Sequence, residues 1–345
     1  MTPRSASRQL TGHIAGHYLS RISLAWAATG DPRFKQRVNY IVSELKLIQR
    51  SQGDGYLGAL MDKDRVDGKT LFEQLSKGVI RSGRFDLNGM WSPWYVQHKI
   101  YAGLRDAYRY TGTREALDIE IKFAAWAERI LAPLSDDQIQ RMLATEFGGM
   151  NEVFADLYAD TGDRRWLALA GKFHHKAIVD RLAENKDILP GIHGNTQRPK
   201  LYGSLKLYLY TDDKVEGAAA KYFWNEVSER HTFATGGNTG NEYFGQPDQL
   251  SEMVDGSTAE TCNVYNLIKM ARTLFSLQTD IRNADYHERA LFNHIPASQD
   301  PDDGRVCYMV PVGRGVQHEY NGKLQSFTCC VGSAMESHAL HADGL

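Results

Sequence analysis

Apolar residues recur at every fourth position near the start of the chain, which is the spacing of one face of an α-helix. The recurring residues are Ile14, Tyr18, Ile22 and Trp26. This helix should end at Thr29-Gly30. Asp31 and Pro32 should then begin a second helix, because aspartate caps helix N-termini and proline suits the first helical position. The pattern therefore predicts a helical hairpin.

Similar turn sequences recur between later helix-like stretches. They are Tyr110-Thr111-Gly112-Thr113, Asp160-Thr161-Gly162-Asp163 and, in degenerate form, Thr279-Asp280. Repeated turns between helices predict an array of helical hairpins. The turns are unevenly spaced, which favours a closed toroid with inserted loops over an open solenoid. No Pro- or Ser-rich linker divides the sequence, so we expect one all-α domain over residues 1–345.

The segments between the predicted helices are rich in glycine, asparagine and aromatic residues. They cover residues 87–95, 148–152, 192–197 and 236–245. In a toroid such loops converge at one mouth, where aromatic faces and amide or imidazole groups suit the CH faces and hydroxyls of a sugar. Residues 306–310 and 316–320 flank Gly313-Arg314-Gly315 and predict a short β-hairpin near the C-terminal end.

Composition and charge exclude several classes of partner. The chain has 40 Lys and Arg against 42 Asp and Glu, a net charge of −2, so no strong field attracts nucleic acid or anionic lipid. No apolar stretch reaches the roughly 18 to 20 residues of a membrane span. The first residues lack a hydrophobic signal core, which predicts a cytoplasmic protein as written, or a periplasmic or secreted one if a signal precedes this sequence. The sequence leaves the oligomeric state open.

The four cysteines, at positions 262, 307, 329 and 330, all lie in the last quarter of the chain. A disulfide between the adjacent Cys329 and Cys330 would be strained, so this pair indicates metal binding or thiolate chemistry. Glu260 and Cys262 stand at a helix entrance, and with the pair they make a four-ligand set that suits tetrahedral zinc. Taken singly, Cys262 and Cys307 could also be small buried residues, and we assign Cys307 that structural role.

Glu242 is a second candidate for chemistry, because it lies in a glycine-rich loop beside Tyr243 and Phe244. A carboxyl group against aromatic walls can keep its proton near neutral pH, as a general acid must, although an exposed, solvated glutamate is the simpler alternative. His98 and His193 could bind sugar hydroxyls or be merely structural. The sequence contains neither a phosphate-binding loop nor a Gly-x-Ser-x-Gly motif.

Taken together, these motifs resemble glycoside hydrolase families 127 and 146, the β-L-arabinofuranosidases and their relatives. The resemblance rests on residues 12–19, 53–57, 94–99, 149–152, 193–196, 241–245 and 260–262 and on the cysteine pair at 329–330. It implies an (α/α)6 barrel with a zinc ion bound by Glu260, Cys262, Cys329 and Cys330. It further implies that Cys329 is the nucleophile and Glu242 the general acid/base.

The same resemblance places His98, Asn151, His193 and Tyr308 in motifs that line the sugar site. Relatives are longer at both ends, so we expect residues 1–345 to be a catalytic barrel lacking N-terminal helices and C-terminal β-sandwich domains. The leading hypothesis is a retaining exo-glycosidase that uses Zn²⁺ and releases β-L-arabinofuranose from plant-derived, arabinose-containing oligosaccharides or glycans. The alternatives are a non-catalytic sugar-binding or degenerate barrel with a structural zinc, and an isomerase or lyase on the same barrel.

Overall fold

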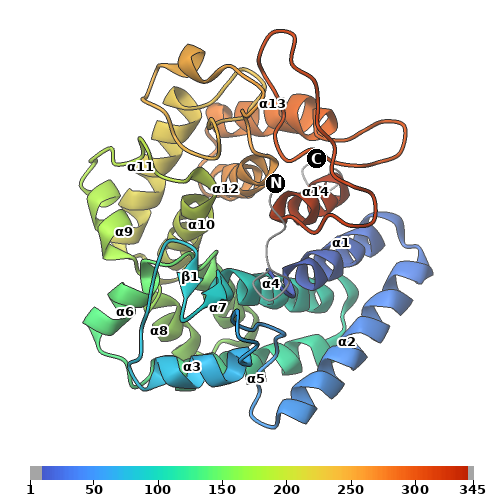
Figure 1. Ribbon diagram of the computed structural model, residues 1–345, viewed down its shortest axis with the longest axis vertical. Coiled ribbons are helices and arrows are strands. Elements are labelled where there is room, and N and C mark those ends of the chain that lie inside the picture. Colours follow the sequence, from blue (N-terminus) through green and yellow to red (C-terminus); the bar gives the residue numbers. More distant parts are fainter. Residues whose placement is uncertain (1–9, 341–345) are drawn as a thin grey trace. The chain divides into compact units, whose positions relative to one another are not determined.

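The computed structural model describes residues 10–340, which form fourteen α-helices, one 3₁₀-helix and a small two-stranded sheet (Figure 1). The chain divides into two compact units at His175. Among the described residues, no helix combines the length and the apolar character needed to cross a membrane. The predicted all-helical class is therefore observed in both units.

The first unit contains eight helices and the sheet. They are α1 (His13–Thr29), α2 (Pro32–Gln52), α3 (Gly68–Ser76), β1 (Asp86–Leu87), β2 (Met90–Trp91), α4 (Pro93–Thr111), α5 (Arg114–Leu131), α6 (Asp136–Leu143), α7 (Met150–Thr161) and α8 (Arg165–Gly171). The antiparallel strands pair Asp86 with Trp91 and Leu87 with Met90.

The predicted helix boundaries are confirmed by the caps that the structure shows. The Asp31 side chain accepts a hydrogen bond from the Arg33 N–H at 2.9 Å, with Pro32 as the first residue of α2. Gly30, Gly112 and Gly162 follow α1, α4 and α7 in the left-handed conformation, with φ between 67° and 75°. Glycine adopts this conformation without the steric cost that a Cβ imposes, so these turns end the helices.

Helix α1 packs on α4 through two glycines. A Cβ on Gly16 would lie 2.0 Å from the Lys99 carbonyl oxygen, and one on Gly103 would lie 2.6 Å from the Gly16 oxygen. Because the two helices cross so closely, the buried face of α1 differs from the predicted one. Tyr18 is 37% exposed, whereas His17 is buried. Backbone proximity, rather than the apolar stripe alone, decides which side of α1 is covered.

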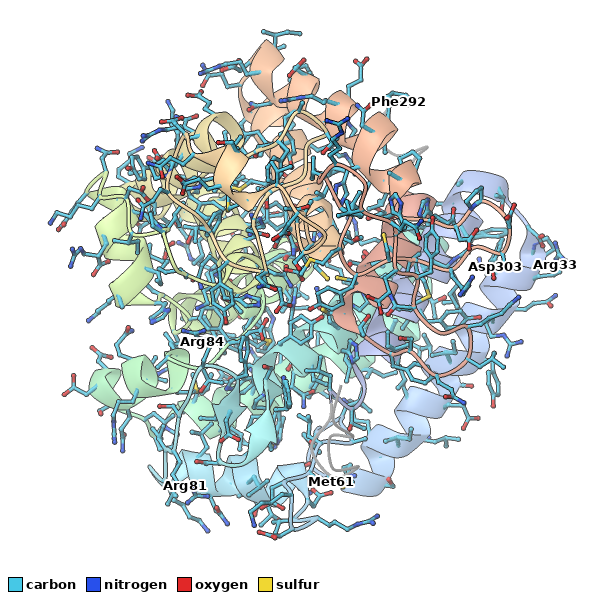
Figure 2. All side chains as sticks on the ribbon, turned by 45° about the horizontal axis from the view of Figure 1, so that its top comes forward. Arg33, Met61, Arg81, Arg84, Phe292 and Asp303 are labelled. Carbon is cyan, nitrogen blue, oxygen red and sulfur yellow. The ribbon has the colours of Figure 1, made fainter. Side chains whose placement is uncertain are left out.

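Aromatic side chains from α3, α4 and α5 form the core of the first unit. Phe72 lies 4.9 Å from Trp94 and 5.0 Å from Trp126, measured between ring centroids, and Tyr101 stacks on Phe123 at 4.2 Å. Large buried rings dominate core energetics through their area. Charged and exposed side chains project outward from this unit, as Arg33 and Arg81 do in Figure 2.

The second unit contains the remaining helices. They are α9 (Lys176–Ala183), α10 (Gly194–Thr211), α11 (Lys214–Arg230), the 3₁₀-helix η1 (Leu250–Met253), α12 (Thr261–Leu277), α13 (Ile281–Ala297) and α14 (Cys329–Ala339). Helix α11 packs against α9 and α10, and α12 packs against α10, α13 and α14 (Figure 1). Within α12 the apolar side chains of Val264, Leu267, Ile268 and Ala271 are buried. Phe275, near the end of the helix, is 38% exposed.

The hairpin predicted over 306–320 is wrong as a pair of strands. An isolated antiparallel bridge joins Cys307 to Tyr320, and the described sheet lies instead in the first unit. Residues 306–310 pair elsewhere. The N–H of Thr261 donates to the backbone carbonyl oxygen of Tyr308 at 3.0 Å, and the N–H of Val310 donates to the backbone carbonyl oxygen of Ala259 at 3.1 Å. Tertiary pairing with the segment before α12 therefore replaces the local hairpin.

Candidate functional site

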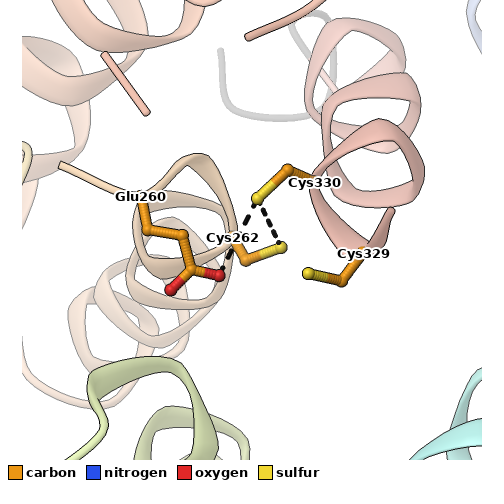
Figure 3. Close-up of side chains that lie close together, drawn as sticks. All are labelled: Glu260, Cys262, Cys329 and Cys330. Carbon is orange, nitrogen blue, oxygen red and sulfur yellow. Dashed lines mark hydrogen bonds between the residues drawn. The ribbon is translucent and has the colours of Figure 1, made fainter. Parts of the chain in front are cut away.

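The four predicted metal ligands lie close together in the second unit. One ligand atom from each of Glu260, Cys262, Cys329 and Cys330 lies within 4.8 Å of the other three. The Cys262 and Cys330 sulfurs are 3.2 Å apart, and the Cys330 sulfur lies 3.8 Å from Glu260 Oε1. Figure 3 shows these side chains converging from two helices. We refer to these four residues as the cysteine cluster.

The starts of two helices place these side chains. Glu260 is the N-cap of α12 and Cys262 is in its first turn, while Cys329 and Cys330 begin α14. The extended backbone at Glu260, with φ −56° and ψ 129°, lets its carboxylate approach the Cys262 sulfur. Residues two apart within a regular helix would diverge by about 200°. The predicted position at a helix entrance is thus what allows both to face one point.

The cluster is buried except at Cys329. Glu260 and Cys330 are fully buried and Cys262 is 3% exposed, whereas Cys329 is partly exposed. Burial raises the pKa of Glu260, and the neighbouring Cys329 raises that pKa further. Burial likewise raises the pKa of Cys262 and of Cys330, so without a cation these groups favour their neutral forms.

The donor set fits zinc. The edges of a tetrahedral site with sulfur and oxygen ligands are roughly 3 to 4 Å long, and the 3.2 Å and 3.8 Å separations in the cluster fall in that range. Glu260 Oε2 is buried and has no hydrogen-bond partner among the described residues, which is costly for a carboxylate unless a cation compensates it. Thiolate ligands select soft or borderline metals such as Zn²⁺.

Glu242 lies in the loop before the cluster, and backbone hydrogen bonds hold it there. The N–H of Gly194 donates to the backbone carbonyl oxygen of Glu242 at 2.7 Å, and the N–H of Asn241 donates to the backbone carbonyl oxygen of Ser257 at 2.8 Å. Asn241 and Glu242 both have positive φ values, 51° and 73°. Non-glycine residues adopt this region at a cost of about 1–2 kcal/mol each, so the surrounding bonds stabilise a strained loop.

Tyr308 connects the loop to the cluster. Its hydroxyl donates a hydrogen bond to Glu242 Oε1 and lies 3.5 Å from the Cys329 sulfur. Burial, and next the charge of Cys329, raise the pKa of Tyr308, so the phenol stays protonated and remains a donor. One phenol oxygen therefore contacts both the partly exposed thiol and the carboxylate.

His193 completes the group in the second unit. Its Nε2 lies 3.7 Å from Glu242 Oε1, and one ligand atom each of His193, Glu242 and Glu260 lie within 4.8 Å of one another. The His193 ring packs edge to face on Tyr243 at 5.3 Å. The structure thus brings together seven of the nine predicted site residues.

The other two predicted residues, His98 and Asn151, belong to the first unit. His98 is buried on α4, with its Nε2 3.4 Å from Glu152 Oε2. Asn151 is buried at the start of α7. A Cβ on Gly148 would lie 2.8 Å from His98 Nδ1, so the glycine pair before α7 leaves room for this imidazole. Their part in sugar binding stays a prediction.

Two residues near the cluster were not singled out by the sequence. Ser333 places its hydroxyl 3.1 Å from the Cys262 sulfur. Arg198 is buried on α10 with its guanidinium over the Phe244 ring at 4.7 Å, and its charge favours an ionised Glu260. The sequence could have indicated Ser333 through helical spacing, because it lies one turn after Cys329 in α14. Arg198 gave no local signal, because its burial depends on tertiary packing.

A comparison with known protein families finds one matching family model. The family model described as "Beta-L-arabinofuranosidase, GH127 catalytic domain" matches residues 4–343. None of the curated proteins compared matches this chain.

Solved structures show the same fold. One is a GH127 β-arabinofuranosidase with 18% identity and a TM-score of 0.69, covering 97% of this chain and 52% of its own. Another is a GH127 β-L-arabinofuranosidase from Geobacillus stearothermophilus T6, with 18% identity and a TM-score of 0.70, covering 98% and 57%. A third is a GH76 α-mannanase from Bacteroides thetaiotaomicron, with 10% identity and a TM-score of 0.59, covering 97% and 86%.

These likenesses confirm the predicted fold class, that of the helical-barrel glycosidases. The chain spans little more than half the length of the two GH127 structures.

Proposed function

Because this chain belongs to the GH127 β-L-arabinofuranosidase catalytic-domain family, we propose that it is a retaining exo-glycosidase acting on terminal β-L-arabinofuranosides. The substrates would be arabinose-containing oligosaccharides or glycans of plant origin. The assignment of residues 1–345 to one catalytic domain is part of this proposal.

One observation carries the proposal. Tyr308 places its hydroxyl against both Glu242 and Cys329, and Cys329 is the one cysteine of the cluster that is partly exposed rather than buried. Retaining glycosidases hold the nucleophile and the acid/base about 5 Å apart, on either side of the bond that breaks. Two groups that contact one phenol oxygen lie close enough together for this spacing.

In the first step Glu242 donates its proton to the glycosidic oxygen while the Cys329 sulfur bonds to the anomeric carbon. The carbon–oxygen bond breaks, and the aglycone leaves as an alcohol. Tyr308 holds one oxygen of Glu242, so the other oxygen carries the proton.

In the second step the Glu242 carboxylate takes a proton from water, and the water oxygen attacks the anomeric carbon. The carbon–sulfur bond breaks, which regenerates the Cys329 thiolate and releases arabinose with its anomeric configuration retained. His193 lies close enough to Glu242 to orient the sugar or this water. We assign His98 and Asn151 to substrate binding on the basis of the family motif.

Glu260, Cys262, Cys329 and Cys330 would hold the zinc ion. A zinc-bound thiol is deprotonated at neutral pH, so the ion would supply a thiolate nucleophile despite the burial of the cluster. Ser333 orients Cys262 through the 3.1 Å contact between its hydroxyl and the sulfur.

The activity test is hydrolysis of 4-nitrophenyl β-L-arabinofuranoside by the zinc-loaded 345-residue chain, with the α-L anomer as control. We expect turnover of the β-L substrate only, and NMR of the first product formed should show retention. Titration calorimetry with arabinose-containing oligosaccharides runs in parallel. Binding without turnover would favour the non-catalytic alternative and overturn the enzymatic proposal.

The metal test is independent of turnover. We expect Cys262→Ser to lose one equivalent of zinc and to melt at a lower temperature, because a bound metal contributes folding free energy. Cys307→Ser is the matched control, since Cys307 is buried in the same unit but lies outside the cluster. Full zinc content in Cys262→Ser would rule out this ligand set.

A further inference from the structure

A second group of ligand-type side chains lies in the same unit and shares no residue with the cysteine cluster. One ligand atom from each of Asp187, Glu226 and His231 lies within 4.8 Å of the other two. Asp187 is in the segment between α9 and α10, Glu226 is in the last turns of α11, and His231 directly follows that helix. Three separate positions of the chain therefore converge on one point.

His231 is the least expected member of this group. Its side chain is fully buried, and neither ring nitrogen has a hydrogen-bond partner among the described residues. The ring packs edge to face on Phe244, with the centroids 5.1 Å apart. A buried polar group without a hydrogen-bond partner destabilises the folded state. A ligand that accepts the lone pair of the imidazole would remove this cost.

The state of the imidazole suits such a ligand. Its ring is buried, which disfavours a charged imidazolium. A neutral imidazole nitrogen is a metal ligand.

Both carboxylates are already oriented through one oxygen. Asp187 Oδ1 accepts a hydrogen bond from the Leu189 N–H at 2.9 Å. Glu226 is 7% exposed, and its Oε1 accepts from Arg230 Nη1 at 2.6 Å. Supporting hydrogen bonds of this kind orient the ligands of metal sites. Arg230 also pairs with Asp248 at 2.8 Å, so its charge is shared between two carboxylates.

We propose that Asp187, Glu226 and His231 bind one divalent first-row metal ion of the kind that prefers oxygen and nitrogen ligands, such as Mn²⁺. Two carboxylates and one neutral imidazole carry a charge of −2, which a divalent cation neutralises. The set contains no sulfur, so it differs in metal preference from the cysteine cluster. Its role is structural: it joins the segment between α9 and α10 to the end of α11.

The test uses Mn²⁺ alone as the probe. The whole chain is freed of metal with a chelator, the chelator is removed, and free Mn²⁺ is followed by electron paramagnetic resonance during titration. We expect one Mn²⁺ per chain. Mn²⁺ binds weakly to thiolate ligands, so the cysteine cluster will not compete for it. We expect Asp187→Asn to weaken binding about tenfold or more.

Control variants keep the outcome specific. Asp248→Asn should bind Mn²⁺ as the unaltered chain does, because Asp248 pairs with Arg230 without belonging to the group. Cys262→Ser should also bind it normally, which separates this proposal from the proposed function. Asp187 is partly exposed, so Asp187→Asn should fold, and its melting temperature in chelator should match that of the unaltered chain.

Three results would overturn the proposal: no Mn²⁺ binding by the unaltered chain, unchanged affinity in Asp187→Asn, or loss of the Mn²⁺ site in Cys262→Ser. Added Mn²⁺ should raise the melting temperature of the unaltered chain but not that of Asp187→Asn.

Discussion

Glu242 and Glu260 lie in neighbouring segments of the second unit, yet their surroundings are opposite. The Glu242 side chain is 32% exposed, on a strained loop, and is held by Tyr308. Glu260 is fully buried at the start of α12 among sulfur atoms. A carboxyl group that exchanges protons with substrate and water must be reachable, whereas a metal ligand benefits from enclosure. Exposure therefore separates the two roles that we propose for these residues, which residue type alone does not distinguish.

The cysteines repeat this contrast, and replacing the exposed one should have the largest effect. Cys329→Ser should lower kcat about 10⁴-fold or more, because serine is a far weaker nucleophile without an activating base. Zinc should be retained weakly by the remaining three ligands. Cys330→Ser should lose zinc and turnover together, and metal analysis beside kinetics distinguishes the two variants.

Trapping identifies the nucleophile directly. A cyclic epoxide of arabinofuranose configuration should label Cys329, as read by peptide mass spectrometry. A label on Cys330, Glu242 or Glu260 would contradict the assignment.

Glu242→Gln should have the next largest effect, a loss of about 10²–10⁴-fold in kcat, because the amide cannot donate or accept the proton. Zinc content should not change, since Glu242 is not part of the cysteine cluster. The loss should be smaller for a 4-nitrophenyl substrate than for an alkyl arabinoside, because nitrophenolate leaves without protonation. Equal losses on both substrates would argue against an acid role.

His294 supplies a pH test of the packing beneath both segments. A Cβ on Gly237 would lie 2.9 Å from His294 Nδ1 and 2.6 Å from the Ala259 Cβ, so all three positions pack together. Burial lowers the pKa of His294 to about 3. The unfolded chain then binds a proton below about pH 6.5 while the native ring stays neutral, so stability falls as the pH falls.

Between pH 7 and pH 5 this residue should lower the free energy of unfolding by about 2 kcal/mol. Urea unfolding at both pH values checks the prediction. The pH-dependent difference should shrink by that amount in His294→Gln, whatever the variant's stability at pH 7. An unchanged difference would show that His294 titrates normally in the native state.

Tyr308→Phe should have the smallest effect, about a tenfold loss in kcat with little change in KM, because Tyr308 positions Glu242 and Cys329 without exchanging a proton itself. Tyr320→Phe is the matched control, since its ring stacks on His318 and it forms no hydrogen bond to the cluster. A loss confined to KM would assign Tyr308 to substrate binding instead.

Local features of the fold were predictable because their causes are adjacent in sequence. Asp31 caps α2 through the N–H two residues ahead, and Gly30 ends α1 through its own φ. The clustering of Glu260 and Cys262 followed in the same way from their place at a helix entrance. Their meeting with Cys329 and Cys330 followed from metal chemistry and the family resemblance rather than from periodicity.

Long-range features were not predictable in this way. The segment around Tyr308 pairs with the residues before α12, although its own sequence favours a hairpin. The covered face of α1 depends on how closely Gly16 and Gly103 approach. Which segment an extended backbone pairs with, and how closely two helices cross, both depend on residues that are distant in the chain. A single sequence does not show which distant residues come into contact.

The two helix starts that supply the cysteine cluster lie far apart along the chain, with Cys262 and Cys330 separated by 68 residues. A metal ion at the cluster would close a ring that contains α13 and the long segment before α14. Closing a ring of this size restricts the unfolded chain by about 4 kcal/mol in the chain-entropy description of cross-links. A protease cut in the exposed part of that segment would then leave two fragments that the ion still joins. Denaturation alone would not separate these fragments, whereas a chelator under denaturing conditions would.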